Sequence, residues 1–459
     1  MPSVLFLQNI YFQNLGPMYI SSVLKREGIK VAMHSTHKLQ SVKLDGIDIV
    51  AFSCTTGSHI LALEWARQIK SMRKYIFIIM GGAHPTFFPE VLSEDSPLDA
   101  ICRGEGESAM KELCLNLHDR EKVSRIPGLF VKTENGIKAN KMGSPSQDLD
   151  ALPFPDRDLY GTDFHGDIQP VLSSRGCAYD CTFCFNNSFR KLVKEETHQS
   201  YCVRYRSPEN ILEELQSIKK ISSLIQFRDE SFTTNKNRLK VLLTMYAQRI
   251  KLPFTCQVRA NELDVDTVKL LKEANVHAVF MGVETGSEKL RNALLKKSLK
   301  DEEIKRGAAL LHQHKIPFRT YNILGLPEET LEDVHSTIRL NQEIKADYPW
   351  VSLLMPYRGT EIYEHFKGHY QSDSVNDLEW FFPKSDLYRD KKELLNLHNL
   401  FILYVKFPFL KPVLDFLTRL PPNPVYRLNY KITYAWASYK SEGMTLGRFM
   451  NHLCKMNSH

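Results

Sequence analysis

Three closely spaced cysteines, Cys177, Cys181 and Cys184, are the residues of this chain best suited to chemistry. Their spacing is Cys-x3-Cys-x2-Cys. Iron–sulfur clusters are held by thiolates and usually take four cysteine ligands, so three in one loop leave one iron without a local protein ligand. An open metal position can bind a substrate or cofactor directly. A structural zinc site is the alternative, and it needs a fourth ligand at zinc-like spacing, for which His198 and Cys202 are nearest.

The rest of the composition is that of a globular protein. The chain has 459 residues, 43% of them hydrophobic and 25% charged, which suggests two or three domains. Nine cysteines are too few for a disulfide scaffold, so the six outside the loop are expected to be buried small hydrophobes. No apolar run approaches the ~20 residues that cross a bilayer, and residues 1–7 read as a first strand instead of a signal peptide. The expected location is the cytoplasm.

The first 140 residues alternate apolar runs with segments of helical periodicity. Buried parallel strands have this apolar character, and their alternation with helices predicts a doubly wound, Rossmann-like α/β sheet. Ligands of such sheets bind at the carboxyl ends of the strands, where residues 53–57 and 81–85 lie. The expected strands are at 4–7, 47–53, 75–80 and 99–103, and the expected helices at 17–27, 59–73 and 107–115.

A proline-punctuated linker, residues 141–165, separates this domain from a second strand–helix alternation at 166–370. Six strand candidates predict a partial (β/α)6 barrel, whose active site should lie at the carboxyl ends of its strands. The cysteine loop follows the first candidate. The six candidates are 169–174, 223–227, 254–258, 278–284, 319–324 and 351–355.

Residues 371–459 form a third region, which is aromatic, basic and expected to be mainly helical, with a break at 421–424. Residues 391–459 contain ten Lys or Arg and three Asp or Glu, so they account for the whole formal net charge of +7. Two interpretations stay open: a packed helical cap that shapes a substrate pocket, and peripheral contact with a membrane surface. Nucleic acid is not an expected partner, because the chain has no recognition fold and no organised basic stripe.

The cysteine loop, with Phe183 before its last cysteine, resembles the signature of the radical S-adenosylmethionine (SAM) superfamily. The resemblance covers about residues 166–365. It implies a [4Fe–4S] cluster on the three cysteines, with the open iron chelating the amino and carboxylate groups of SAM. One electron then cleaves SAM to methionine and a 5′-deoxyadenosyl radical, which abstracts hydrogen from an unactivated carbon.

Four further segments resemble family patterns and imply cofactor contacts. Residues 280–287 resemble the fourth-strand segment that helps to hold SAM, which places Glu284 toward the SAM polar groups. Arg259, at the end of the third strand, resembles a residue that meets the SAM carboxylate. Asn322 and Leu324 lie in a segment that resembles the fifth strand beside the adenine. Residues 227–232 resemble the second-strand segment, whose acidic pair often faces the active site.

Residues 1–140 resemble the cobalamin-binding domain that precedes many radical SAM barrels. Glycines at strand ends let the backbone approach a large ligand closely. The Asp-x-His-x-x-Gly motif, which supplies a lower cobalt ligand in many cobalamin proteins, is absent, so the axial geometry stays open. His84 as a cobalt ligand and His84 as a structural or tail-contacting residue are both considered, with the second preferred. The residues implied to contact cobalamin are Ser53, Thr55, Gly81, Gly82, His84, Pro85, Gly104 and Glu105.

Together the two resemblances imply a cobalamin-dependent (class B) radical SAM methyltransferase that methylates an unactivated carbon of a bulky or apolar substrate. A flavodoxin or ferredoxin is the implied reductant. The alternative is a non-methylating oxidative cyclase or hydroxylase, similar to the anaerobic magnesium-protoporphyrin monomethyl ester cyclase. A methylthiotransferase is disfavoured, because the contexts of Cys54, Cys102 and Cys114 do not match that family. A cobalamin or iron–sulfur sensor is the non-enzymatic reading, which the large barrel with its SAM-like segments disfavours.

Overall fold

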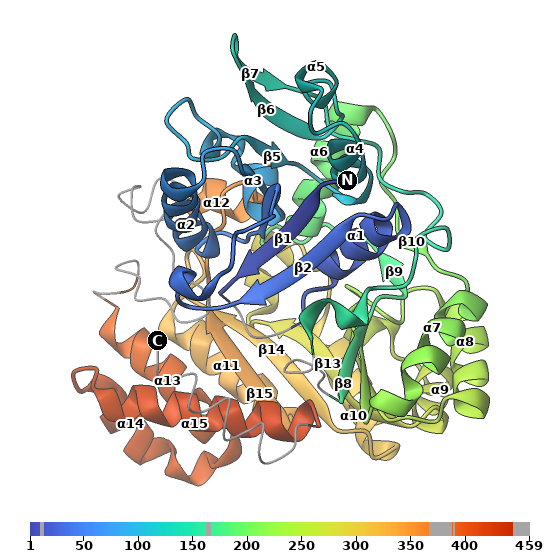
Figure 1. Ribbon diagram of the computed structural model, residues 1–459. Helices are drawn as coiled ribbons and strands as arrows, with labels where there is room; N and C mark the ends of the chain where they lie inside the picture. The colour runs from blue at the N-terminus through green and yellow to red at the C-terminus, as the bar shows by residue number, and fades with distance from the viewer. Residues whose placement is uncertain (10–12, 162–166, 367–387, 389–390, 444–459) are drawn as a thin grey trace.

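The computed structural model describes residues 1–9, 13–161, 167–366, 388 and 391–443. Its N-terminal part is a seven-stranded sheet in the order β2-β1-β3-β4-β5-β6-β7 (Figure 1). The first five strands in this order are parallel, as the sequence predicts, whereas β6 and β7 add an antiparallel hairpin that the sequence analysis did not foresee. The strands are β1 (Ser3–Gln8), β2 (Lys30–Ser35), β3 (Ile49–Ser53), β4 (Phe77–Gly81), β5 (Ala100–Cys102), β6 (Leu129–Thr133) and β7 (Gly136–Ala139).

Helices cover both faces of this sheet because its strands are apolar on both sides. Val4 and Phe6 of β1 pack in the cluster that includes residues of α1 and α4, while Leu5 and Leu7 of the same strand pack with residues of α2. Successive side chains of a strand point to opposite faces, so a continuous apolar run supplies two cores. The helices are α1 (Leu15–Arg26), α2 (Ser58–Met72), α3 (Ala83–Phe87), α4 (Glu107–Leu115) and α5 (Arg120–Val123).

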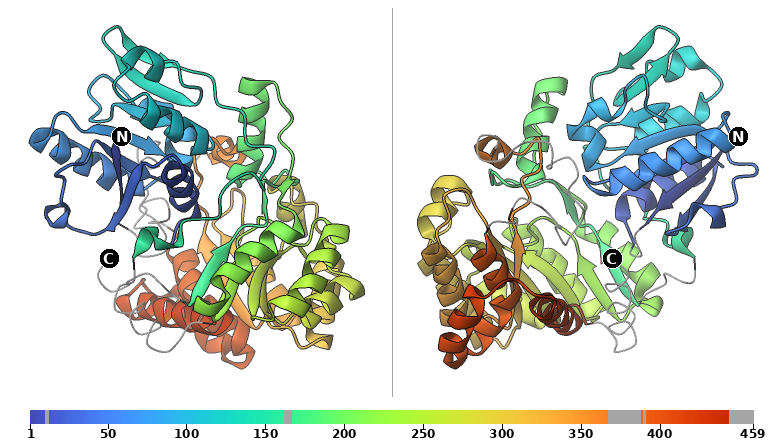
Figure 2. Two further views of the ribbon diagram at one scale, coloured as in Figure 1. Left: turned by 45° about the vertical axis from the view of Figure 1, so that its right-hand side comes forward. Right: turned by 90° about the vertical axis from the view of Figure 1, so that its left-hand side faces the viewer.

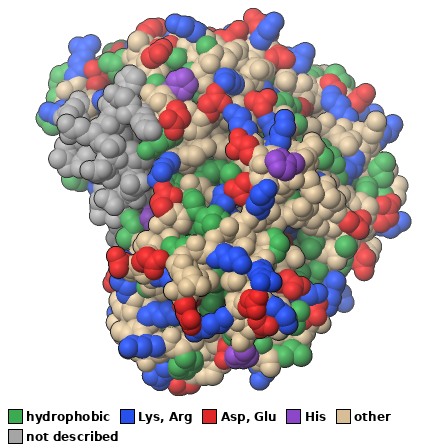
Figure 3. Space-filling view, turned by 90° about the horizontal axis from the view of Figure 1, so that it is seen from above, with side chains coloured by type: hydrophobic (Ala, Val, Ile, Leu, Met, Phe, Trp, Pro, Cys, Tyr) green, Lys and Arg blue, Asp and Glu red, His purple; other side chains and the backbone are tan. Residues whose placement is uncertain are grey.

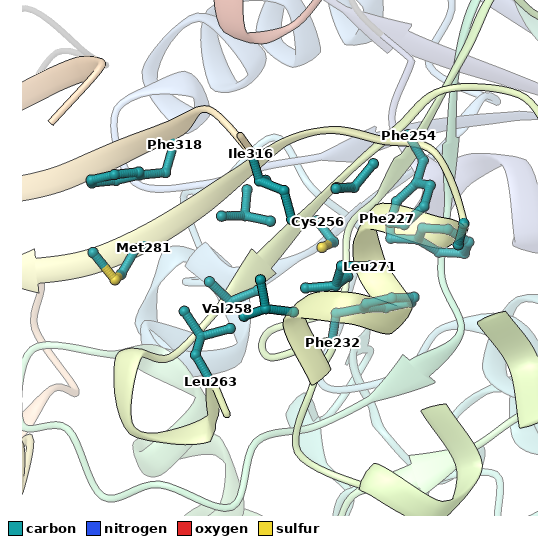
Figure 4. Packing of buried hydrophobic residues seen from close by; sticks show 14 of the residues in the cluster. Phe227, Phe232, Phe254, Cys256, Val258, Leu263, Leu271, Met281, Ile316 and Phe318 are labelled. Atoms are coloured by element: carbon teal, nitrogen blue, oxygen red, sulfur yellow. The ribbon is translucent and has the colours of Figure 1, made fainter. Parts of the chain in front are cut away.

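The second sheet has six parallel strands in the order β15-β14-β13-β12-β11-β8, which makes an open, partial barrel. The barrel strands and helices pack around a buried apolar cluster that includes Phe227, Phe254, Cys256 and Phe318 (Figure 4). The strands are β8 (Ile168–Val171), β11 (Leu224–Phe227), β12 (Phe254–Val258), β13 (Val276–Glu284), β14 (Phe318–Leu324) and β15 (Tyr348–Leu353). The helices between them are α7 (Pro208–Ile218), α8 (Lys236–Arg249), α9 (Val265–Glu273), α10 (Asp301–Gln313) and α11 (Leu331–Glu343).

The first barrel strand is shorter than the expected 169–174. β8 ends at Val171 because Ser173 and Ser174 turn toward the buried carboxylate of Asp229, to which both hydroxyls donate. Ser174 then begins β9 (Ser174–Arg175), which pairs antiparallel with β10 (Arg204–Tyr205). This hairpin encloses the cysteine loop and α6 (Phe185–Thr197).

The third region is helical where the structure describes it, at 388 and 391–443. Its helices are α13 (Lys392–Lys406), α14 (Lys411–Arg419) and α15 (Pro424–Ser441), and α12 (Glu361–Phe366) precedes them. The break between α14 and α15 falls at the predicted prolines, which lack the N–H that a helix interior requires. No helix in the described part of the chain has both the length and the apolarity to cross a membrane. The prediction for 371–387, 389–390 and 444–459 lies outside the described residues.

Helix α15 covers the amino-terminal ends of the barrel strands. The Arg319 guanidinium at the start of β14 donates to Ser441 and forms an ion pair with Glu442 at 2.9 Å. His277, near the start of β13, contacts the Lys440 carbonyl at 3.0 Å. Helix α15 therefore closes this end of the barrel. The open end is formed by the carboxyl ends of the strands, which face the N-terminal domain (Figure 2). The division at 1–140, 141–165, 166–370 and 371–459 stays a prediction.

Candidate active site

The three cysteines lie in the loop between β9 and α6, and all three are partly exposed. Gly176 starts the loop with a φ of +96°, and an added Cβ there would lie 3.1 Å from the Tyr201 ring. Burial raises the pKa of the Cys177 thiol to about 11, and the neighbouring thiols of Cys184 and Cys181 add to the shift. The Cys177 thiol is therefore neutral at pH 7, and its binding to a metal cluster would release a proton.

Neighbouring elements hold this loop at both ends. Thr182 donates through its backbone N–H to Leu295 and through its hydroxyl to Leu294, at 3.1 and 2.8 Å. The Arg190 side chain donates to the Cys177 carbonyl at 3.0 Å. The amide of Asn186 lies 3.7 Å from the Cys184 sulfur, where it can donate to a thiolate. These contacts fix the loop before any cofactor binds.

Tyr179 attaches the middle of the loop to the barrel. Its hydroxyl donates to Glu262 at 2.5 Å, and its ring lies under the Arg259 guanidinium, 3.9 Å from the ring centroid. The Glu262 carboxylate is buried and accepts three further hydroxyl bonds from the loop after β11. One carboxylate thus links the cysteine loop to two strand ends. The three further donors are Ser231, Thr233 and Thr234.

The donor set fits a [4Fe–4S] cluster better than zinc. His198 follows α6, so the 13 residues of that helix place it about 20 Å along the axis from Cys184. Cys202 returns near Gly176, but its side chain is exposed. Among the described residues no three His, Cys, Asp or Glu side chains gather around one point, as the ligands of a single ion do. In a cuboidal cluster each thiolate binds a different iron, so its ligands need no common point.

Glu284 stands at the end of β13 between two glycines. It has a φ of +67° and forms a buried ion pair with Lys297 at 2.7 Å, so it is not a surface charge. An added Cβ on Gly282 would lie 2.4 Å from the Glu284 side-chain oxygen and would displace this carboxylate. An added Cβ on Gly286 would lie 2.2 Å from the Ser336 carbonyl, so glycine at 286 lets the chain approach α11 closely. Contact between Glu284 and SAM stays a prediction.

The other predicted SAM residues lie at or beside the carboxyl ends of the strands. Phe183 packs against the apolar cluster that includes Leu326 and Ile362, and Arg259 donates to the Ser298 carbonyl at 3.2 Å. The Asn322 amide is engaged with Asn341, Thr320 and the Trp350 carbonyl, so its polar atoms face α11 and β15. The Leu324 side chain packs toward α13. These two side chains therefore support the strand, and their contacts with adenine stay predictions.

The two acidic residues of the second-strand segment, Asp229 and Glu230, have different surroundings. The buried Asp229 accepts the hydroxyls of Ser173 and Ser174, which shapes the chain just before the cysteines. Glu230 lies beside the loop, and one of its oxygens is buried without a hydrogen-bond partner. Burial raises the pKa of Glu230 to about 7. Of the pair, only Glu230 is available to exchange a proton near the cluster site.

A cavity of about 230 Å³ opens at the carboxyl ends of the N-terminal strands. Its wall includes five of the predicted cobalamin residues together with Leu172 and Arg175 of the second domain. An added Cβ on Gly82 would lie 2.6 Å from the Cys54 carbonyl, so the tight turn at this wall requires glycine. At this wall the glycines let the backbone approach a ligand closely. The five predicted residues in the wall are Ser53, Gly81, Gly82, Gly104 and Glu105.

Three predicted cobalamin residues, Thr55, His84 and Pro85, lie outside this wall. The His84 ring is buried between His59, at 3.6 Å between centroids, and Phe88, at 4.7 Å. Its Nδ1 lies 3.1 Å from the Thr56 hydroxyl. Burial, aided by His59, lowers the pKa of His84 to about 3. This packing keeps the imidazole neutral, and the role of His84 toward cobalamin stays a prediction.

Ion pairs join the cobalamin cavity to the cysteine loop. Arg175, two residues before Cys177, pairs with Glu107 at 2.6 Å and with Glu105 at 3.4 Å. Glu105 also pairs with Arg204 of β10 at 2.6 Å. Burial alone would raise the pKa of Glu105, but the bonds and charges of Arg204 and Arg175 hold it below its usual range. Arg175 therefore lines the cavity of the N-terminal domain and also precedes the cysteine loop by two residues.

Several residues of this region were not predicted. Tyr179 stands inside the cysteine motif and Arg175 precedes it by two residues, so their positions could have drawn attention to them. Tyr19 and Glu262 lie far away in sequence and carry no motif, and only the fold brings them to the site.

Comparison with known proteins agrees with this geometry. Residues 171–340 match the radical SAM superfamily, and residues 10–114 match the B12 binding domain. The chain is 30% identical over 370 residues to an uncharacterized methyltransferase of Pyrococcus horikoshii, covering 76% of this chain and 78% of the relative. This protein belongs to the cobalamin-binding radical SAM family. It is therefore a radical SAM enzyme whose cofactors are a [4Fe–4S] cluster, SAM and cobalamin, as the sequence predicted.

Two further proteins resemble this chain, one in sequence and one in fold. The anaerobic magnesium-protoporphyrin IX monomethyl ester cyclase of Synechocystis is 24% identical over 311 residues, covering 66% of this chain and 58% of the cyclase. The cobalamin-dependent SAM radical enzyme OxsB, solved with aqua-cobalamin and SAM bound, has the same fold, with a TM-score of 0.70 and 19% identity. That match covers all of this chain and 75% of OxsB. The predicted fold class is confirmed.

Proposed function

We propose that this radical SAM enzyme transfers a methyl group from cobalamin to an unactivated carbon of its substrate. The observation that carries the proposal is the shared position of Arg175, which lines the cobalamin cavity and stands two residues before the first cluster cysteine. The two cofactor regions therefore meet at one place, between the domains. A methyl donor and a radical generator are both required to methylate a carbon that carries no activated hydrogen.

In this proposal the residues of the chain hold and insulate the cofactors. Cys177, Cys181 and Cys184 hold the cluster, and the Tyr179–Glu262 bond keeps their loop against the barrel. When bound, the cluster and SAM supply the 5′-deoxyadenosyl radical, and cobalamin supplies the methyl group. Glu230, with its pKa of about 7, is positioned to hold or release a proton beside the cluster loop.

The test uses the anaerobically reconstituted full-length protein with methyl-labelled SAM and a strong reductant. We expect 5′-deoxyadenosine and labelled cobalamin, and labelled product once the substrate is supplied. Cys177→Ala should abolish 5′-deoxyadenosine formation, whereas Cys202→Ala, which removes an exposed cysteine outside the cluster motif, should retain it. Absence of 5′-deoxyadenosine from a protein with full iron, SAM and cobalamin would refute the proposal.

The oxidative cyclase is the second candidate, because a cyclase is among the relatives. It predicts 5′-deoxyadenosine and cobalamin binding without label in the product. The methylthiotransferase interpretation loses support, since Cys54 packs on one face of the N-terminal sheet and Cys102 and Cys114 on the other. Burial raises the pKa of each of these three thiols to about 12.

Radical SAM enzymes need an electron donor, and we propose a flavodoxin or ferredoxin for this role. A bulky or apolar substrate is proposed because one relative is named for a porphyrin ester. The cytoplasmic location stays a prediction.

A further inference from the structure

Exposed large hydrophobic side chains concentrate on the C-terminal helices. Among the described residues, eight of the seventeen such side chains lie between 407 and 436. We call these eight the apolar patch. Phe409 is 76% exposed, Val425 69% and Phe416 63%. The apolar patch consists of Phe407, Phe409, Val413, Phe416, Val425, Leu428, Ile432 and Trp436.

The patch follows helical periodicity on two successive helices. Val425, Leu428, Ile432 and Trp436 are spaced by three, four and four residues, so they form one stripe along α15. The opposite face of α15, which includes Tyr430, packs on the barrel, where the Tyr430 hydroxyl donates to the Val351 carbonyl. A helix that is apolar on both sides is normally buried on both sides. The described residues of the chain cover only one side of α15.

Helix α14 repeats this arrangement. Its buried residues Leu414 and Thr418 face the protein, whereas Val413 and Phe416 are exposed. Phe409, in the 3-10 turn Pro408–Leu410 that precedes α14, is exposed as well. The two helices meet at their junction, where the Tyr426 hydroxyl donates to the Leu417 carbonyl of α14 at 3.2 Å. Both helices pack on the largely buried α13, so they form an outer layer of the molecule.

Basic side chains accompany the patch. From 406 to 441 the sequence contains six Lys or Arg and one acidic residue, Asp415, which is paired with Lys411. Arg419 of α14 and Arg427 and Lys440 of α15 are exposed on the same two helices. Interfacial helices combine aromatic and aliphatic side chains with basic ones in this way, because the apolar groups enter the acyl boundary while the cations meet anionic headgroups.

The position of the patch leaves room for a planar partner. Helices α14 and α15 lie at the end of the molecule opposite the N-terminal domain in all the ribbon views (Figures 1 and 2). The face seen from the side of the N-terminal domain has acidic and basic side chains intermixed (Figure 3). A second copy of the chain suits the patch poorly, since a twofold contact would bring the same excess of positive charge together.

We propose that α14 and α15 dock this enzyme peripherally on an anionic lipid surface, with the apolar patch in the interface. The partner is a bilayer rich in anionic headgroups. The helices lie in the plane of the interface and do not span it. This docking holds the barrel by its closed end, so the cofactor site between the domains stays accessible.

The test is co-sedimentation of the full-length protein with vesicles of phosphatidylglycerol and phosphatidylcholine, against vesicles of phosphatidylcholine alone. Binding should need the anionic lipid and weaken as salt is raised. Replacing Phe409 and Phe416 with Ser should weaken binding about tenfold for each side chain. Replacing Arg419, Arg427 and Lys440 with Gln should weaken it about a hundredfold in total.

Matched controls separate docking from general stickiness. Val241→Ser and Val265→Ser remove exposed apolar side chains on α8 and α9 and should leave binding unchanged. Circular dichroism and 5′-deoxyadenosine formation without vesicles should match the wild type for every variant. The proposal is overturned if the wild type does not bind the anionic vesicles, or if the controls weaken binding as much as the patch variants. Sedimentation showing a dimer that Phe409→Ser and Phe416→Ser dissociate, without vesicle binding, would assign the patch to self-association instead.

Discussion

Tyr179→Phe tests whether one hydroxyl holds the cluster loop in place. The substitution removes the bond to Glu262 at 2.5 Å but keeps the ring on which the Arg259 guanidinium stacks at 3.9 Å. It therefore changes a single contact of the loop. The cysteines themselves are untouched.

The size of the effect follows from the partners of Glu262. A hydrogen bond to a charged group contributes about 1.5–3 kcal/mol. Because the Glu262 carboxylate keeps three other hydroxyl donors, it is not left without partners, and the loss should lie near the lower limit, about 1.5 kcal/mol. If the cysteine loop must open before iron can leave the cluster, Tyr179→Phe should make this opening about tenfold more frequent than in the wild type.

The assay is the rate at which an excess of chelator removes iron from the reconstituted cluster under anaerobic conditions. Tyr179→Phe should lose iron about tenfold faster than the wild type. Tyr246→Phe is the control, because it removes a buried hydroxyl that donates to the Leu252 carbonyl inside the barrel wall, away from the loop. It should lower the free energy of unfolding by about 1 kcal/mol without changing iron loss. Equal iron loss from Tyr179→Phe and the wild type would refute the reasoning.

Three further predictions concern the N-terminal domain. Gly82→Ala should weaken cobalamin binding measured by absorbance titration, because its Cβ would meet backbone at 2.6 Å, whereas Gly46→Ala, also at positive φ but in open space, should bind normally. Glu105→Ala should destabilise the protein by about 3–5 kcal/mol in urea unfolding, since it strands the buried Arg204 charge; a loss below about 1 kcal/mol would contradict the ion-pair argument. The pKa of His84 is about 3 in the folded protein, below its ordinary value of 6.5. The unfolded chain therefore takes up a proton at His84 as the pH falls through 6.5, whereas the folded protein does not, so the free energy of unfolding decreases below this pH. About 2 kcal/mol should be lost between pH 6.5 and 5, and His84→Gln should flatten that slope in urea unfolding at a series of pH values.

Short sequence patterns predicted the cluster loop and the parallel strands, because each of these features depends on residues that are close together in the sequence. The spacing of Cys177, Cys181 and Cys184 identified a cluster loop, since one short segment supplies all three thiolates. Continuous apolar runs identified the parallel strands, because such strands are buried on both faces. The antiparallel hairpin at 129–139 escaped notice, as did the early end of β8, which depends on a distant carboxylate, Asp229.

Individual contacts could not be derived from the sequence. The contacts of Asn322 and Leu324 with adenine stay predictions, and the sequence did not indicate that their side chains face α11 and α13, because this depends on what packs against each side of the strand. Tyr179 and Glu262 meet across 83 residues, and Arg175 meets Glu107 across 68. The sequence by itself determined which cofactors this protein needs. The tertiary structure decided how their regions meet and which side chains hold them together, since such contacts form only when distant strand ends converge.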